Sequence, residues 1–175
     1  EMSASLVGSE MCIRDRGYTV MYSKTFGNVS VNEMVNCIKG FILSDKNYKY
    51  KITVGTDSQN RSLTKVVVVV AVHRIGRGGI FFYEIKYVPK ITNVRQKIYY
   101  ETALSLELAS KLSKSFEKAN IKEDIEIHVD IGTNKNGKTF ELISEITGWI
   151  TGTGYKYQIK PYSYAASCIA DRISK

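Results

Sequence analysis

The sequence predicts an α/β fold in which helices flank a mixed sheet of five strands, three antiparallel and then two parallel. Three strand-like segments follow one another through short turns between residues 50 and 88. Two further strand-like segments alternate with helical segments after residue 120. Strands joined by tight turns are antiparallel, whereas strands separated by a helix are parallel. The 175 residues, 43% of them hydrophobic, suffice for one domain with its own core.

Residues 1–20 are predicted to be a non-native or disordered extension, which leaves 21–175 as the domain. The extension has the period of neither a strand nor a helix. Residues 4–16 resemble a translated sequencing-adapter fragment, so they are set aside in reasoning about the fold, as a tag would be. The alternative is a short genuine extension that is disordered or loosely docked.

The first helix is predicted to begin at Ser30. This residue is a favourable N-cap, and Glu33 follows three positions later, which is the pattern of a capping box. Apolar residues then recur at helical spacing. They are Met34, Val35, Ile38, Phe41 and Ile42. A polar loop over 44–50 ends the helix.

Residues 50–56, 65–74 and 80–88 are predicted to be the three strands of an antiparallel meander. The second contains five consecutive valines, as expected for a strand buried on both faces. The glycine-rich segment 76–79 is typical of a hairpin turn. Pro89 ends the third strand, because proline cannot donate a hydrogen bond to the sheet.

The second half of the chain alternates helices and strands. A long helix is predicted over 93–119, followed by a strand over 125–131. Gly152 and Gly154 end an amphipathic helix over 139–151. A strand over 155–161 and a final helix over 163–174 complete the order.

The composition favours a cytoplasmic protein with a polyanionic partner. A formal net charge of +8 points first to nucleic acid. The three cysteines are scattered and show no CxxC spacing, which indicates reduced thiols and argues against a zinc site. No apolar run approaches the roughly 20 residues that cross a bilayer, so no membrane association is expected. The oligomeric state is left open.

Asp57 and Asp130 are expected to lie close together. The predicted order of elements is that of the ribonuclease H-like fold, in which the first and fourth strands are parallel neighbours. Asp57 follows the strand 50–56 and Asp130 lies near the end of the strand 125–131. Ligand sites of α/β sheets lie at such strand ends. Because buried charges are usually paired or bound to metal, Asp57 is predicted to be a metal ligand. The alternative is an Asx-turn that closes its strand.

Two helices can bring further carboxylates to this place. The long helix offers Glu101 and the last helix offers Asp171. Glu107 lies six residues after Glu101 and therefore on a different face of the helix, so Glu101 is preferred. Cleavage of a phosphodiester needs an activated water and a stabilised leaving oxygen, and two Mg²⁺ or Mn²⁺ ions can supply both. Such hard cations prefer carboxylate oxygens.

Four segments resemble the YkuK family of predicted ribonuclease H-like nucleases. They are VGTDSQ (54–59), YYETALSLELA (99–109), HVDIGTNKNGKT (128–139) and KPYSYAASCIADR (160–172). The resemblance runs from about residue 26 to residue 175. It implies the ribonuclease H-like fold, a site for Mg²⁺ or Mn²⁺, and nuclease activity. Matched motif by motif, it implies four metal ligands that are also the catalytic residues: Asp57, Glu101, Asp130 and Asp171.

Basic and hydroxyl side chains beside the two later motifs are candidates for substrate binding. They are Lys135, Lys138, Lys160 and Ser163. The alternative for each is a solvated loop residue. His128 lies on the same side of its strand as Asp130 and is expected to pack beneath a helix. The alternative for His128 is a direct action on a proton or on the substrate.

The function predicted from the sequence is a divalent-metal-dependent nuclease that hydrolyses phosphodiester bonds of RNA, DNA or an RNA/DNA hybrid at a two-metal carboxylate site. One alternative is a non-catalytic nucleic-acid-binding domain that retains the ribonuclease H-like fold. Another is a metal-dependent hydrolase of a small phosphate ester.

Overall fold

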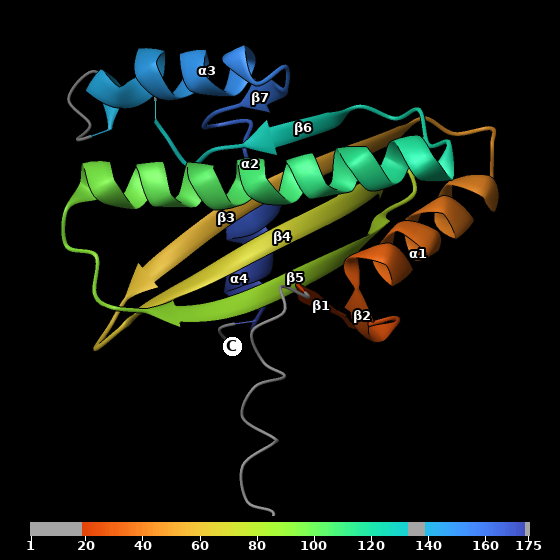
Figure 1. The fold of residues 1–175 in the computed structure, drawn as a ribbon, viewed down its shortest axis with the longest axis horizontal. Helices are drawn as coiled ribbons and strands as arrows, with labels where there is room; N and C mark the ends of the chain where they lie inside the picture. The colour runs from red at the N-terminus through yellow and green to blue at the C-terminus, as the bar shows by residue number, and fades with distance from the viewer. Residues whose placement is uncertain (1–18, 133–138, 174–175) are drawn as a thin grey trace, which may run out of the picture.

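The computed structural model describes residues 19–132 and 139–173, with only the backbone described for 170–173, and its strands form one mixed sheet (Figure 1). The order across the sheet is β2-β1-β5-β4-β3-β6-β7. The strands are β1 (Val20–Ser23), β2 (Gly27–Ser30), β3 (Tyr50–Asn60), β4 (Thr64–Arg74), β5 (Gly79–Val88), β6 (Ile125–His128) and β7 (Lys156–Gln158).

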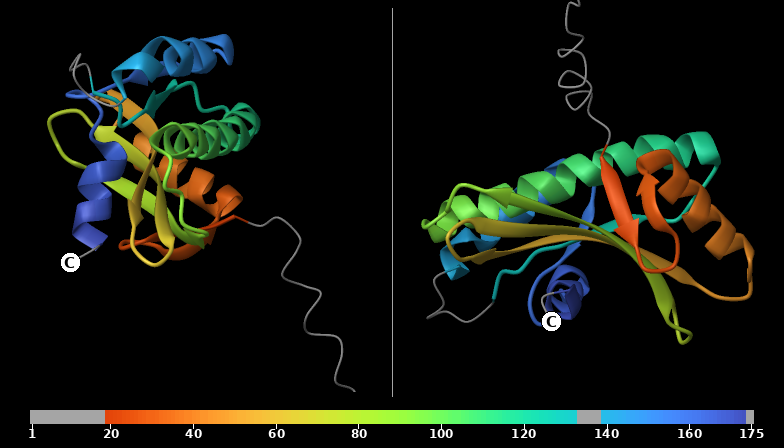
Figure 2. Two further views of the ribbon diagram at one scale, coloured as in Figure 1. Left: turned by 90° about the vertical axis from the view of Figure 1, so that its left-hand side faces the viewer. Right: turned by 90° about the horizontal axis from the view of Figure 1, so that it is seen from below.

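Helices cover both faces of this sheet. They are α1 (Val31–Leu43), α2 (Val94–Ala119), α3 (Ile143–Gly152), which a 3-10 turn (Phe140–Leu142) precedes, and α4 (Ala165–Ile173). Figure 2 shows α1 and α2 on one face and α4 on the opposite face. Within the described residues, no helix is both long and apolar enough to span a membrane.

The central five strands have the predicted arrangement. β3, β4 and β5 form the antiparallel meander, and β6 pairs in parallel with both β3 and β7. The capping box at the start of α1 is also confirmed. The backbone N–H of Glu33 donates to Ser30 Oγ over 3.3 Å, and the backbone N–H of Ser30 donates to Glu33 Oε2 over 2.7 Å.

The predicted number of strands is wrong, because the residues that the structure describes form a sheet of seven strands and not five. The two additional strands, β1 and β2, form an antiparallel hairpin, and β1 pairs with the edge of β5 through Tyr22 and Tyr83. Each has only four residues, too few to show a clear alternation of apolar and polar side chains. The hairpin covers an edge of the meander that would otherwise present unpaired backbone groups.

The lengths of the strands that carry or precede Asp57 and Asp130 also differ from the prediction. β3 continues to Asn60, so Asp57 lies inside the strand, opposite Val67, and not after its end. The alternative of an Asx-turn at Asp57 is thereby excluded. β6 ends at His128, which leaves Asp130 in the segment that follows the strand.

The core has two unequal parts because helices cover the two faces unequally. The larger part lies between the sheet and the helices α1, α2 and α3, and includes Ile52, Val54 and Leu112. The smaller part lies under α4, where Ala166 and Ile169 pack against Val67 and Val69. Alternate side chains of β3 therefore face α2 and α4.

Candidate metal centre

The register of β3 and β6 brings Asp57 and Asp130 to the same place. The parallel pairing joins Ile52 to Ile125 and Gly55 to His128. Continued by two residues, this register sets Asp130 beside Asp57, although the ladder itself ends at His128. Both aspartates line one small hollow, which also borders the first turn of α4. The structure thus brings these two predicted ligands together.

Asp130 is partly buried and already has a cationic neighbour. Its Oδ1 lies 2.6 Å from the Nζ of Lys160, and 31% of the Asp130 side chain is exposed. The same Oδ1 atom is shielded from solvent and receives no well-directed hydrogen bond, so the contact with Lys160 is an ion pair. Lys160, predicted to bind substrate, therefore contacts a predicted metal ligand in this structure.

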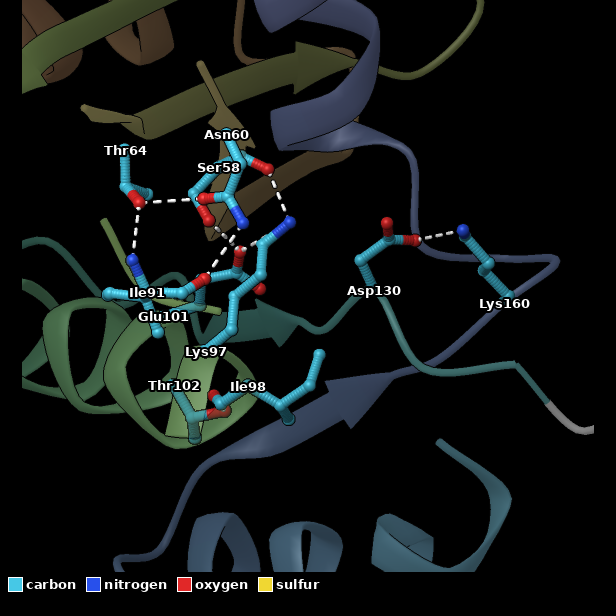
Figure 3. A network of polar contacts seen from close by, with 10 residues as sticks. All are labelled: Ser58, Asn60, Thr64, Ile91, Lys97, Ile98, Glu101, Thr102, Asp130 and Lys160. Atoms are coloured by element: carbon cyan, nitrogen blue, oxygen red, sulfur yellow. Dashed lines mark hydrogen bonds and ion pairs between the residues drawn. The ribbon is translucent and has the colours of Figure 1, made fainter. Parts of the chain in front are cut away.

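Glu101 reaches the site from the other face of the sheet. It lies in the second turn of α2, and only 3% of the residue is exposed. Ser58 Oγ donates a hydrogen bond of 2.5 Å to Glu101 Oε1 (Figure 3). Glu107, the alternative on the same helix, has a side chain that is 61% exposed and forms an ion pair with Lys111. Of these two glutamates, only Glu101 is buried against β3.

Burial and the groups around the Glu101 carboxylate together raise its pKa. The pKa of Glu101 is raised from 4.5 to about 7, chiefly by burial and to a smaller extent by the negative charges of Asp57 and Asp130. The hydrogen bond from Ser58 and the charge of Lys97 act in the opposite direction. Each aspartate is therefore close enough to Glu101 to disfavour its charged form, in addition to the larger effect of burial.

Lys97 lies one helical turn before Glu101 and holds its ammonium group over the same strand. Its Nζ donates to the backbone oxygen of Ser58 over 2.5 Å and lies 3.8 Å from Glu101 Oε1. Figure 3 shows this group together with the separate contact between Lys160 and Asp130. Glu101 and Asp130 thus each have an ammonium group as neighbour.

Hydrogen bonds join α2 and the segment before it to the end of β3 and the start of β4, and hold Glu101 in place. Ser105, one turn after Glu101, shares a hydrogen bond of 2.8 Å with Thr56. Asn60 donates to the backbone oxygen of Ile91 over 2.8 Å, and the backbone N–H of Ile91 donates to Thr64 Oγ1 over 2.9 Å (Figure 3). These bonds fix the start of α2 against the strand that carries Asp57.

The remaining predicted residues are placed only in part. Ser163 lines the same hollow as Asp57 and Asp130, and its Oγ is buried without a hydrogen-bond partner. Asp171 belongs to α4, but its side chain lies outside the described part of the chain. Lys135 and Lys138 also lie outside the described residues.

His128 packs beneath a helix, as expected. It is 3% exposed, and its Nδ1 accepts hydrogen bonds from the backbone N–H groups of Tyr164 and Ala165 at the start of α4. Burial lowers the pKa of His128, whereas the nearby Glu126 carboxylate opposes that shift. The ring is therefore kept neutral by its surroundings.

Sequence reasoning missed the roles of Ser58 and Lys97. Ser58 lies two residues after Thr56, so the period of a strand sets both toward α2. Lys97 lies four residues before Glu101, which is the spacing of neighbours on a helix. The strand period at Ser58 and the helical spacing of Lys97 and Glu101 can both be read in the sequence. Neither of them shows which face of β3 is covered by α2.

The donor atoms of the three carboxylates are of the type that hard divalent cations prefer. All of their donors are carboxylate oxygens, and Asp130 Oδ1 is a buried oxygen without a directed hydrogen bond. A cation beside Glu101 would also offset the repulsion that raises its pKa. Among the side chains that the structure describes, however, no three Asp, Glu, His or Cys residues gather closely enough to form a complete metal site.

Comparisons with known proteins agree with the predicted fold. A family profile described as Ribonuclease H-like matches residues 33–175. The chain is also 32% identical over 169 residues to a protein of Bacillus subtilis (strain 168) named "Uncharacterized protein YkuK", covering 89% of this chain and 97% of that protein. These matches confirm the resemblance predicted from the sequence. No solved structure gives a significant match.

Proposed function

Because this chain belongs to the ribonuclease H-like family and is a relative of YkuK, we propose that it is a divalent-metal-dependent nuclease. Its substrate would be RNA, DNA or an RNA/DNA hybrid. One observation carries the proposal. The buried carboxyl group of Glu101 has a pKa raised to about 7, chiefly by burial and also by the charges of two further carboxylates, Asp57 and Asp130. Buried negative charge destabilises a protein unless cations offset it, and a bound metal ion would do so here together with the ammonium groups of Lys97 and Lys160.

Mg²⁺ or Mn²⁺ would be held by Asp57, Glu101 and Asp130, with Asp171 as a fourth ligand. Bound there, the ion would supply Lewis-acid stabilisation of the phosphate and an activated water. The chain supplies the orientation of the ligands. Ser58 holds Glu101 through its hydrogen bond of 2.5 Å, and the parallel register of β3 and β6 holds the two aspartates.

Two lysines provide positive charge for a substrate phosphate. Lys160 Nζ lies 2.6 Å from Asp130, and 52% of the lysine side chain is exposed, so its ammonium group can turn toward a ligand. Lys97 is 27% exposed and is anchored on the backbone oxygen of Ser58. Lys160 is thus the better placed of the two to contact a phosphate group beside the aspartates. Lys135, Lys138 and Ser163 remain proposed contacts to the substrate.

The test is a cleavage assay with labelled single-stranded RNA, single-stranded DNA and an RNA/DNA hybrid. We expect cleavage in Mg²⁺ or Mn²⁺ that ends on addition of EDTA. Asp57→Asn and Glu101→Gln should each lower the rate at least about a hundredfold. Glu107→Gln is the matched control, because it makes the same chemical change on an exposed turn of α2. Equal activity of wild type and Asp57→Asn would contradict the proposal.

A second candidate is a non-catalytic domain that binds nucleic acid. The contacts of Lys97 and Lys160 favour it, because ammonium groups already neutralise part of the acidic site without any metal. Under this alternative the protein binds the oligonucleotides in EDTA and in Mg²⁺ equally well and cleaves none of them with either metal. Binding and cleavage measured on the same protein sample separate the two functions.

A further inference from the structure

Helix α4 begins without a capping side chain of its own. The backbone oxygen of Tyr164 accepts the first helical hydrogen bond, from the N–H of Cys168 over 3.1 Å, so Tyr164 occupies the N-cap position. A tyrosine side chain cannot fold back to accept from the first turn as Ser, Thr, Asp or Asn does. The first N–H groups of a helix nevertheless need an acceptor. In α4 the acceptor comes from another part of the chain.

His128 supplies that acceptor from the end of β6. Its Nδ1 lies 3.2 Å from the backbone nitrogen of Tyr164 and 3.3 Å from that of Ala165, and both N–H groups donate to it. The ring of Tyr164 packs edge-on against the imidazole, with the centroids 5.0 Å apart. Because His128 is only 3% exposed, water cannot replace it as the acceptor.

The other ring nitrogen of His128 is held by a charged pair. Nε2 lies 3.0 Å from Glu126 Oε1, and the same oxygen lies 2.6 Å from the Nζ of Lys51. Since Nδ1 accepts two hydrogen bonds, it carries no proton. The proton of the neutral ring is therefore on Nε2, from which it is donated to Glu126.

Gly55 allows the strand, the histidine and the helix to come this close. It pairs with His128 across β3 and β6. A Cβ atom at Gly55 would lie 3.2 Å from the backbone oxygen of His128 and 3.3 Å from the Cβ of Ala166 in α4. Small residues at this crossing let the start of α4 lie directly over the two strands that lead to Asp57 and Asp130.

We propose that His128 is a positioning residue that caps α4 through Nδ1 and so holds the start of this helix beside Asp57 and Asp130. The hollow that contains both aspartates is lined on its other side by Ser163 and the first turn of α4. Asp171 belongs to the same helix. The consequence for metal binding rests on the proposed function, whereas the cap itself rests on the contacts alone.

The simpler explanation is that His128 only fills space in the core, and two substitutions distinguish the explanations. Asn sets its side-chain oxygen near the position of Nδ1, so His128→Asn retains an acceptor for Tyr164 and Ala165. Gln reaches the position of Nε2, so His128→Gln retains the contact with Glu126 but loses the cap. A residue that merely fills space would make both variants behave alike.

The experiment measures amide hydrogen exchange of Tyr164 and Ala165 by NMR in the full chain. We expect His128→Gln to accelerate exchange at both amides by about tenfold or more, while His128→Asn stays within about threefold of wild type. Mn²⁺ affinity, measured by titration calorimetry, should fall about tenfold in His128→Gln only, as for other partners that orient metal ligands. Equal exchange in the two variants would overturn the cap.

The wild-type protein provides a test that does not depend on how the variants fold. A two-bond ¹H–¹⁵N spectrum of the His128 ring should show the proton on Nε2 and none on Nδ1. A proton on Nδ1 would overturn the proposal.

Accelerated exchange in His128→Gln with unchanged Mn²⁺ affinity would overturn the positioning role. Wild-type protein that binds no Mn²⁺ and cleaves nothing would overturn the proposed nuclease, while the exchange and tautomer results would still stand.

Discussion

Glu101 is where stability and metal binding make opposite demands. Burial favours the neutral acid, whereas a metal ligand must be charged. The hydrogen bond from Ser58 and the charge of Lys97 offset part of that cost. The remaining cost of the buried charge either is offset by a bound cation or lowers the stability of the metal-free protein. Measurements on Glu101 therefore test whether the site binds a cation.

The metal-free protein is expected to lose stability as the pH rises through the pKa of Glu101. The folded pKa, about 7, lies above the ordinary value of 4.5, so the folded state binds the proton more tightly than the unfolded state. The stabilising effect is complete below about pH 4.5 and is lost by about pH 8, amounting to roughly 3 kcal/mol. Glu101→Gln should remove this dependence and be the more stable protein at pH 8.

Urea denaturation at pH 5 and pH 8 in EDTA measures the effect. Glu107→Gln is the control, because Lys111 lowers the pKa of that exposed glutamate and burial contributes little. The control should keep the pH dependence of the wild type. A Glu101→Gln protein that is less stable than wild type at pH 8 would show that the buried carboxylate is satisfied without a cation.

At the scale of elements, the β1–β2 hairpin extends the meander beyond the five strands of the prediction. Met21 of β1 is fully buried, and Phe26, in the hairpin turn, stacks on the buried Phe82 of β5 with ring centroids 5.9 Å apart. The segment just after residue 20 therefore contributes to the core. The predicted domain boundary at residue 21 falls inside β1, one residue after the strand begins.

Met21→Ala should destabilise the protein by about 2–5 kcal/mol, the usual range for removing a large side chain from a packed core. Val20→Ala is the matched control, because Val20 lies in the same strand with 50% of its surface exposed. The control is expected to change the free energy of unfolding by less than about 0.5 kcal/mol. Thermal and urea unfolding measure both. Equal, small effects would mean that β1 is not part of the cooperative domain.

At the scale of the whole molecule, the candidate carboxylates come from both faces of the sheet. Figure 2 shows α2 and α4 on opposite faces of the sheet. Glu101 approaches from the face covered by α2, and the hollow with Asp57 and Asp130 borders the first turn of α4. The overall charge of +8 contrasts with this local concentration of acidic groups. The positive net charge of the chain would attract a polyanion. A cation would be needed only where a phosphate of the polyanion lies beside the carboxylates, because these groups repel one another.

Binding of a single-stranded oligonucleotide is therefore expected to weaken as salt rises. Each neutralised phosphate releases counterions, so about three contacts raise the dissociation constant roughly tenfold or more between 50 and 200 mM NaCl. Fluorescence anisotropy in EDTA measures this without cleavage. An oligonucleotide with an uncharged methylphosphonate backbone is the control and should bind weakly with no salt dependence. Tight binding that does not change with salt would exclude phosphate contacts as its source.

The sequence by itself determined the central strand order and the proximity of Asp57 to Asp130. The strands and their directions follow from local patterns: the period of two, the turns between strands, and the helices that separate the later strands. The position of β6 beside β3, which brings the two aspartates close, follows from the likeness of this order of elements to the ribonuclease H-like fold. The start of α1 was equally predictable, because Ser30 and Glu33 satisfy each other within one turn. The family also followed from motifs that each lie within a short stretch of chain.

Only the tertiary structure decided how the site is held. The hydrogen bond from Ser58 to Glu101 joins residues 43 positions apart, and the cap from His128 to Ala165 joins residues 37 positions apart. The ion pair of Lys160 with Asp130 and the two extra strands are likewise contacts between distant segments. A local pattern indicates which face a side chain takes, but not which element lies over that face. That depends on how the helices pack, and burial then decides which carboxylate has a raised pKa.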